Sequence, residues 1–347
     1  MSKPRIAVDA MGGDHGVEVV VPGAVEGAKT FDVALRLVGD PARITPVLDG
    51  IDTTSIDVDI IPASDTIGMD EHPAQAVRRK PQASIVVALR AVKEGSADAV
   101  ISAGNSGAMM AGGLMVLGRI SGIERPAIAS YMPSARSRTL VLDLGAVTDP
   151  KPINLVQFAL MGKVYAERVL ERSDPAIGLL SNGEEPTKGN QLVQAVYPLL
   201  SQTPGIRFHG NVEGKDVAAG TVDIVVTDGF TGNVVLKTAE GVATMLTDIL
   251  RDELTSTVPR RLAAFVLRPA FRAVRRRLDY AEIGGAPLLG IDGTVIIAHG
   301  RSNERAICNA VGVARRSSEQ QLIEGIRAAL EQAQVGAAAT VVAEPAQ

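Results

Sequence analysis

The strongest constraint on this chain is the regular alternation of short apolar runs with longer segments of helical period. The run Arg5–Asp9 is followed by a helical pattern over 17–28, and the same order recurs along the sequence. Parallel strands need a crossover connection of a dozen or more residues, usually a helix, so this alternation is typical of a largely parallel sheet covered on both faces. The sequence therefore predicts an α/β fold.

The remaining elements extend this pattern into three layers. Further strands are expected at 33–38, 58–61, 98–101, 127–131, 139–142, 176–180, 222–226 and 294–298. The clearest helices are expected at 83–94 and 152–171, the second with proline in its first turn. We expect a three-layer Rossmann-like fold in a single α/β domain over residues 1–335, followed by a disordered tail at 336–347.

Composition and charge narrow the class of protein. With 46% hydrophobic and 21% charged residues the chain can bury a sizeable core, and its net charge of −4 argues against a nucleic-acid binder. The single cysteine, Cys308, excludes internal disulfides and a cysteine-cluster metal site. No signal-peptide pattern precedes the first strand, and no apolar run approaches the roughly 18 residues of a spanning helix. We expect a cytoplasmic protein.

Four glycine-rich loops that follow predicted strands form the candidate site. They are Asp9–Gly16, Ser102–Gly107, Asp228–Asn233 and His299–Asn303. Ligands in sheets of this class lie beyond the carboxyl ends of the strands, and a glycine turn leading into a helix presents free N–H groups to an anion. The recurrence of this plan predicts a site for a phosphate-sized anion, although each loop alone is equally compatible with ordinary turn and capping chemistry.

Several longer motifs occur in order along nearly the whole chain. They are IAVDAMGGDHG from Ile6, SAGNSGA from Ser102, LDLGA from Leu142, KPINLVQFA from Lys151, GLLSNGEEPTKGN from Gly178, DGFTGNVVLKTAEG from Asp228, GGAPLLGIDG from Gly284 and AHGRSNERAICNAV from Ala298. With these motifs the chain closely resembles the PlsX family, the bacterial phosphate acyltransferases (acyl-ACP:phosphate transacylases) of phospholipid synthesis.

The resemblance implies an enzyme that transfers a fatty acyl group from acyl carrier protein (ACP) to inorganic phosphate. The products are acyl phosphate and free ACP, in the first committed step toward phosphatidic acid. It also implies a homodimer associated peripherally with the anionic inner face of the membrane. There a downstream acyl-phosphate glycerol-3-phosphate acyltransferase consumes the product. The resemblance implies neither a cofactor nor a metal ion.

The chain departs from the family pattern at four positions. Val147 stands where the family usually has asparagine, and Pro150 where it often has cysteine. Both changes weaken a catalytic role for the LDLGA loop. Arg301 replaces a small residue and Asp292 an asparagine, so altered charge is expected in the last loop.

Candidate site residues follow from the loops and from the chemistry that the resemblance implies. The phosphate ligands are expected to be Gly104, Asn105, Ser106, Gly107, Lys188 and Asn190. The catalytic residues are expected to be Asp14, His15, Asn233, Lys237 and His299, with either histidine as the acid that protonates the departing thiol. The alternatives are that Asp14 and His15 cap a helix, that Lys237 pairs with Glu240, and that Lys188 is a solvated surface lysine.

An arginine-rich segment needs its own explanation. Between Leu254 and Leu278 there are seven arginines and no acid, interleaved with apolar residues. This pattern predicts an amphipathic helical hairpin over 254–282, broken near Pro269, that contacts anionic lipid or an acidic carrier protein. The surface residues are expected to be Arg260, Arg261, Phe265, Arg268, Phe271, Arg272, Arg275 and Arg276. The alternative is a solvated helix that completes a dimer interface.

Three competing functions are weaker. A phosphotransacetylase-like enzyme using acyl-CoA shares the chemistry but does not need a basic hairpin. A nicotinamide dehydrogenase is disfavoured because the spaced glycines of a dinucleotide fingerprint are absent after the first strand, and no Walker pattern occurs. A non-catalytic scaffold that binds membrane or carrier protein leaves the glycine-rich loops unexplained.

Overall fold

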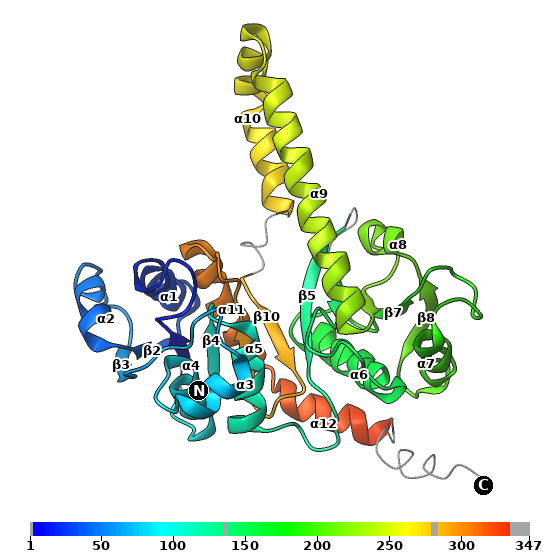
Figure 1. Cartoon of the computed structure of the whole chain (residues 1–347), viewed down its shortest axis with the longest axis horizontal. Coiled ribbons are helices and arrows are strands. Elements are labelled where there is room, and N and C mark those ends of the chain that lie inside the picture. Colours follow the sequence, from blue (N-terminus) through cyan, green and yellow to red (C-terminus); the bar gives the residue numbers. More distant parts are fainter. Residues whose placement is uncertain (1–2, 135–137, 279–283, 334–347) are drawn as a thin grey trace.

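The computed structural model describes residues 3–134, 138–278 and 284–333 and shows one sheet running through the molecule (Figure 1). Within these residues the sheet has 11 strands in the order β3-β2-β1-β4-β11-β10-β5-β6-β9-β7-β8. Most neighbours are parallel, while β10 is antiparallel to both of its neighbours and β5 is antiparallel to β6. The predicted α/β class with a largely parallel sheet is confirmed.

The elements have the following bounds. The strands are β1 (Arg5–Asp9), β2 (Ala34–Gly39), β3 (Val58–Pro62), β4 (Ala99–Ser102), β5 (Ala127–Pro133), β6 (Arg138–Leu142), β7 (Ala176–Leu180), β8 (Arg207–Val212), β9 (Ile224–Val226), β10 (Ala286–Leu289) and β11 (Thr294–Ile297). The helices are α1 (Val17–Phe31), α2 (Pro41–Leu48), α3 (Pro73–Arg79), α4 (Ser84–Lys93), α5 (Ser106–Gly112), η1 (Gly113–Leu117), α6 (Pro152–Arg168), α7 (Gln191–Gln202), α8 (Gly214–Ala219), α9 (Gly229–Thr255), α10 (Val258–Leu278), α11 (Glu304–Glu319) and α12 (Leu322–Gln332).

The first half of the sheet is covered on both faces because its strands are apolar throughout. Alternate residues point to opposite faces of a strand, so Ile6 and Val8 pack with α1 and α11, whereas Ala7 packs with α3, α4 and α5. Strands buried on both sides read as continuous apolar runs. These are the strands that the sequence locates best.

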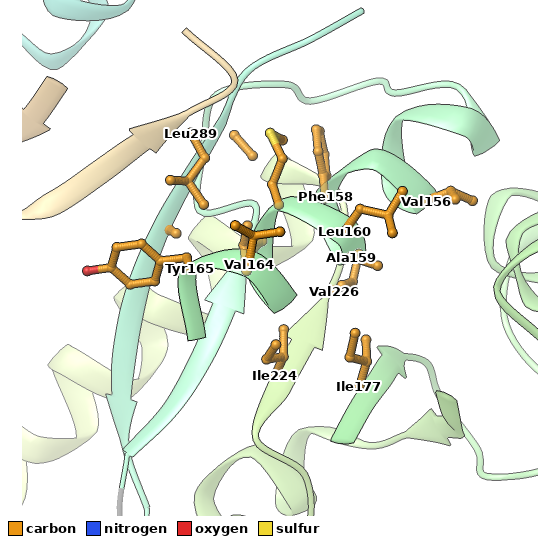
Figure 2. Close-up of a cluster of buried hydrophobic side chains, with 14 of the residues drawn as sticks. Val156, Phe158, Ala159, Leu160, Val164, Tyr165, Ile177, Ile224, Val226 and Leu289 are labelled. Atoms are coloured by element: carbon orange, nitrogen blue, oxygen red, sulfur yellow. The ribbon is translucent and has the colours of Figure 1, made fainter. Parts of the chain in front are cut away.

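The second half repeats the arrangement around α6 (Figure 2). Phe158 and Tyr165 on α6 are fully buried, and the helix packs over Ile177 of β7 and Ile224 of β9. α8 and α9 contribute to the core on the opposite face of this half. Together with the first half this gives three layers, with the carboxyl ends of strands from both halves facing one another.

Two strands, β8 and β10, were not predicted from the sequence. β8 reads RFHGNV, with its side chains exposed at the start, because it is the edge strand and has one neighbour. β10 reads APLL, is four residues long and contains Pro287. Neither has the apolar run from which a buried strand is recognised.

The helical hairpin differs from its predicted form. Its arms are α9 and α10, the chain reverses at 256–257, and Pro269 lies inside α10. The reversal lies in a run of Ser and Thr, and Pro259 stands in the first turn of α10, as is common at the start of a helix. A proline inside a helix removes one backbone hydrogen bond, but α10 continues through Pro269. The hairpin therefore starts at Gly229 and projects from the body of the molecule (Figure 1). Among the described residues, no helix is long and apolar enough to cross a membrane.

The single-domain boundary at 335 stays a prediction. The tail at 336–347 and the hairpin residues 279–282 lie outside the described residues.

Candidate functional site

A cavity of about 510 Å³ lies where the two halves of the sheet meet the base of the hairpin. Five of the predicted catalytic and phosphate-binding residues line it, namely Asp14, Ser106, Asn233, Lys237 and His299. Arg301, Glu240, Ser130 and Tyr131 also line it. The apolar side chains at the cavity are those of Met69, Ile128, Leu144, Leu236 and Ile297. The structure thus gathers residues from all four glycine-rich loops around one space, together with Lys237 from the helix that begins in the loop at 228–233.

A buried carboxylate joins the first two loops. Asp9 ends β1, is fully buried, and accepts a hydrogen bond of 2.6 Å from the hydroxyl of Ser102 at the end of β4. The same hydroxyl accepts the N–H of Gly104 at 3.0 Å. A Cβ atom on Gly12 would lie 2.7 Å from the nitrogen of Gly104, so the close approach of the two loops requires glycine there. Burial raises the pKa of Asp9, and the Ser102 hydroxyl opposes that shift.

Asn105 is committed to structural hydrogen bonds. Its Oδ1 accepts the N–H of Ala108 and so caps α5, while its Nδ2 donates to the carbonyl oxygens of Gly68, Met69 and Glu71. Gly104, Asn105 and Gly107 do not line the cavity, in contrast to Ser106. Of the predicted phosphate-binding residues in the loop at 102–107, Ser106 therefore lines the cavity.

Asp143, which the sequence did not single out, holds the loop whose Leu144 and Gly145 line the cavity. It follows β6 in the LDLGA motif, is fully buried, and its carboxylate accepts N–H groups from Ile128, Gly145, Ala146 and Val147 at 2.6–3.1 Å. Burial raises its pKa, and these backbone hydrogen bonds oppose the shift. Val147 contributes its backbone N–H, which any residue except proline supplies, so the departure from the family pattern at this position preserves the loop.

The first turn of α9 packs directly on the Asp143 loop. A Cβ atom on Gly232 would collide with the carbonyl oxygen of Asp143, so the helix can approach the loop only with glycine there. Asp228 caps the helix by accepting the N–H of Thr231 at 2.8 Å. This contact fixes the start of α9 and thereby places Asn233 and Lys237, which lie one turn apart, at the cavity.

Lys237 has a carboxylate partner within the cavity. Its Nζ lies 2.9 Å from Oε2 of Glu240, one turn further along α9, and both side chains are partly exposed. The pairing with Glu240 was the alternative considered from the sequence. An ion pair this exposed contributes little to stability, so an incoming anion can take the place of the carboxylate.

The surroundings of His299 lower its pKa and so favour the uncharged imidazole. Its pKa is lowered by burial first and then by the positive charges of Lys237 and Arg301, while Glu240 and Asp14 oppose the shift. Nδ1 accepts the N–H of Arg301 at 3.1 Å, so the proton of the neutral ring lies on Nε2. The loop is also tied to the first glycine-rich loop, because the N–H of Asp14 donates to the carbonyl of Gly300 at 2.8 Å.

We expect His299 to titrate below pH 6.5, the ordinary value for histidine. Because the unfolded chain binds that proton more readily, the histidine's contribution to stability is complete above pH 6.5 and is lost as the pH falls through the lowered pKa. Nitrogen-detected NMR of the imidazole should show Nε2 protonated at pH 7.5. Lys237→Ala should move the titration midpoint upward, and a midpoint that stays in place would contradict the assigned cause.

Other predicted residues lie away from the cavity lining. His15 is exposed, Lys188 is exposed in the turn after β7, and Asn190 caps α7 by accepting the N–H of Val193. On the hairpin, Arg260, Arg261, Phe265, Arg268 and Phe271 are exposed, and Arg260 pairs with Glu253. The side chains of Arg272, Arg275 and Arg276 lie outside the described residues.

The two charge departures have different surroundings. Arg301 lines the cavity and adds a second cation beside Lys237. Asp292 does not line it, and its carboxylate accepts a hydrogen bond of 2.6 Å from Arg327 on α12. Of the two departures, Arg301 therefore changes the charge of the cavity, and Asp292 does not line it.

Comparisons with known proteins identify the family to which the chain belongs. The model of a family described as "Fatty acid synthesis protein" matches residues 4–325. The chain is 51% identical over 324 residues to a phosphate acyltransferase of Desulfitobacterium hafniense strain Y51, and 50% identical over 324 residues to one of Heliobacterium modesticaldum. Each alignment covers 93% of this chain and 96% of the relative.

Solved structures share the fold at low sequence identity. A phosphotransacetylase from Streptococcus pyogenes superposes with a TM-score of 0.64 at 16% identity, over 92% of this chain and 95% of the other. Likeness at this level concerns the fold alone. The family match and the identity to its members decide the assignment, and they confirm the resemblance seen in the motifs: the chain belongs to the PlsX family of phosphate acyltransferases.

Proposed function

We propose that this chain transfers a fatty acyl group from ACP to inorganic phosphate. The observation that supports this most is the composition of the cavity, in which Lys237, Arg301 and His299 lie beside an apolar wall that includes Leu144 and Leu236. A phosphate needs cations and N–H donors, whereas an acyl thioester needs apolar surface. The cavity offers a polar surface for the phosphate and an apolar surface for the acyl thioester, side by side.

The reaction requires no protein nucleophile. An oxygen of hydrogen phosphate attacks the thioester carbonyl carbon, the carbonyl oxygen takes the negative charge, and the carbon–sulfur bond then breaks. The thiolate of ACP receives the proton that the phosphate carried, so the products are acyl phosphate and free ACP. Positioning supplies much of the rate, because well-oriented reactants reach effective molarities of about 10⁵ M or more.

Six of the polar side chains at the cavity then have a defined task. Lys237 and Arg301 hold the phosphate charge, with Ser106 as a further hydrogen-bond donor. The Nε2–H of His299 and the amide of Asn233 donate to the oxygen that becomes negative. Asp14 lies at the same end of the cavity and balances the positive charge around His299.

The hairpin is the surface that we assign to partners. Large apolar side chains are exposed on both arms, including Leu246 and Ile249 on α9 and Leu262 and Phe265 on α10. Arginines flank them on α10. We propose that this surface serves the homodimer, the acidic ACP and the anionic membrane, where the downstream acyl-phosphate glycerol-3-phosphate acyltransferase receives the product.

A phosphotransacetylase-like reaction with acyl-CoA is the second candidate, favoured by the shared fold. The two are separated by incubating purified protein and phosphate with palmitoyl-ACP or with palmitoyl-CoA, and trapping acyl phosphate as the hydroxamate. We expect product with palmitoyl-ACP and none when phosphate is omitted. Product from the CoA donor alone would establish the second candidate, and no product from either would overturn both.

A further inference from the structure

A short loop before α3 closes one side of the cavity and is held there by Asn105. The Nδ2 of Asn105 lies 3.1, 3.2 and 3.3 Å from the carbonyl oxygens of Gly68, Met69 and Glu71. The loop is also closed on itself, because the Glu71 carboxylate accepts the N–H of Gly68 at 2.7 Å and pairs with Lys80 at 2.7 Å. Its shape is therefore set by an amide donor on one side and a salt bridge on the other.

The loop presents Met69 to the cavity. This side chain lines the cavity although it is 56% exposed. Its Cε lies 3.3 Å from the position of a Cβ atom built on Gly300, so Met69 reaches across to the loop after β11. The thioether thus lies close to the end of the cavity where His299 and Arg301 are found.

We propose that Met69 is a donor-side contact that packs on the acyl chain next to the thioester, and that Asn105 is the residue that positions it. This rests on the proposed function. A thioether has no N–H to offer a phosphate, whereas its unbranched, polarizable chain adapts to an alkyl chain.

The hydrogen bonds of Asn105 explain why it acts through the loop. Its two amide hydrogens are shared among three carbonyl oxygens, and its Oδ1 accepts the N–H of Ala108 at 3.0 Å. No hydrogen remains for a phosphate oxygen. With 6% of its surface exposed, the side chain is also shielded from a ligand in the cavity. Asn105 therefore positions the loop that contacts the acyl donor, whereas the sequence predicted that it binds phosphate.

Two variants and a matched control test the proposal. Met69→Ala removes the contact, and Asn105→Asp keeps the helix cap while losing the amide donor. Met115→Ala changes another exposed methionine, on η1, that does not line the cavity. We expect Met69→Ala to raise the KM for palmitoyl-ACP about fivefold to tenfold, as for the loss of a partly buried methionine, and to leave the KM for phosphate within twofold.

Asn105→Asp should raise the KM for palmitoyl-ACP in the same way and also speed amide hydrogen exchange at 66–72, whereas Met115→Ala should do neither. A rise in the KM for phosphate without a rise for the acyl donor, in either variant, would overturn the proposal.

A second readout needs no turnover. Palmitoyl-ACP without phosphate should slow amide exchange at 66–72 in the natural protein and not in Met69→Ala. If the natural protein makes no acyl phosphate yet shows this protection, the proposed function fails and the donor contact stands. Turnover without the protection would leave the proposed function standing and overturn the Met69 contact. Protection of equal size in Met69→Ala would also overturn that contact. This readout needs only the natural protein and Met69→Ala, so the contact stays testable if Asn105→Asp does not fold.

Discussion

Replacing Lys237 by alanine is expected to lower kcat/KM for phosphate by about 10²-fold, because Lys237 holds the phosphate charge and a hydrogen bond to a charged group contributes about 1.5–3 kcal/mol. Lys237 lies at the cavity with His299 and Arg301, and its partner there is the Glu240 carboxylate at 2.9 Å. In the natural protein we expect the phosphate substrate to replace that carboxylate. In the variant Glu240 stays near the site without its counter-charge, and it repels phosphate.

The control for this experiment is the second lysine that the sequence singles out. Lys188 is exposed in the turn after β7 and does not line the cavity, so Lys188→Ala should change kcat/KM for phosphate by less than twofold. Steady-state formation of acyl phosphate at varied phosphate concentration measures both variants. A large loss with Lys188→Ala and none with Lys237→Ala would move the phosphate site to the turn before α7.

Asp143→Ala is expected to lower the free energy of unfolding by at least about 3 kcal/mol, because it leaves four buried or partly buried backbone N–H groups without their acceptor. These groups belong to Ile128 of β5 and to the loop over 145–147. The first turn of α9 rests on the same loop through Gly232. Loss of the carboxylate therefore also releases the helix that carries Lys237, and activity should fall with stability.

A graded comparison separates this effect from the loss of an ordinary cap. Asp228→Ala removes one capping carboxylate from the same helix start and should cost about 1 kcal/mol. Urea unfolding followed by circular dichroism measures both variants under identical conditions. Equal destabilisation by the two substitutions would show that Asp143 acts as a local cap and does not join β5, β6 and α9.

The parts of the fold that the sequence predicts are those whose local pattern and tertiary surroundings agree. β1 and β7 are found at their predicted bounds because strands buried on both faces carry unbroken apolar runs. The glycine-rich loops are recognisable because close approach of two backbones, as between Gly12 and Gly104, excludes side chains. Both signals can be read from a short stretch of sequence, although the contact that requires glycine at position 12 is made with a distant segment.

What the sequence did not reveal depends on contacts between distant segments. β8 is recognised as a strand only through its pairing with β7. The roles of Asn105 and Asp143 depend on which backbone groups the fold brings to them. Asn105 binds carbonyl groups 34–37 positions earlier in the chain, and Asp143 accepts an N–H group from β5. The buried carboxylate of Asp143 had one local signal, the glycine that follows at 145, which suits a turn folded around an acceptor.

The length of α9 has a mechanical consequence. It is one helix from Gly229 to Thr255, so the hairpin turn lies about 27 Å along the axis from Lys237, at 1.5 Å for each of the intervening residues. A helix also fixes angular phase: deleting a single residue between the two points would rotate everything beyond it by about 100° relative to the cavity. A partner bound at the tip of the hairpin is therefore held at a fixed distance and in a fixed orientation relative to the reacting groups.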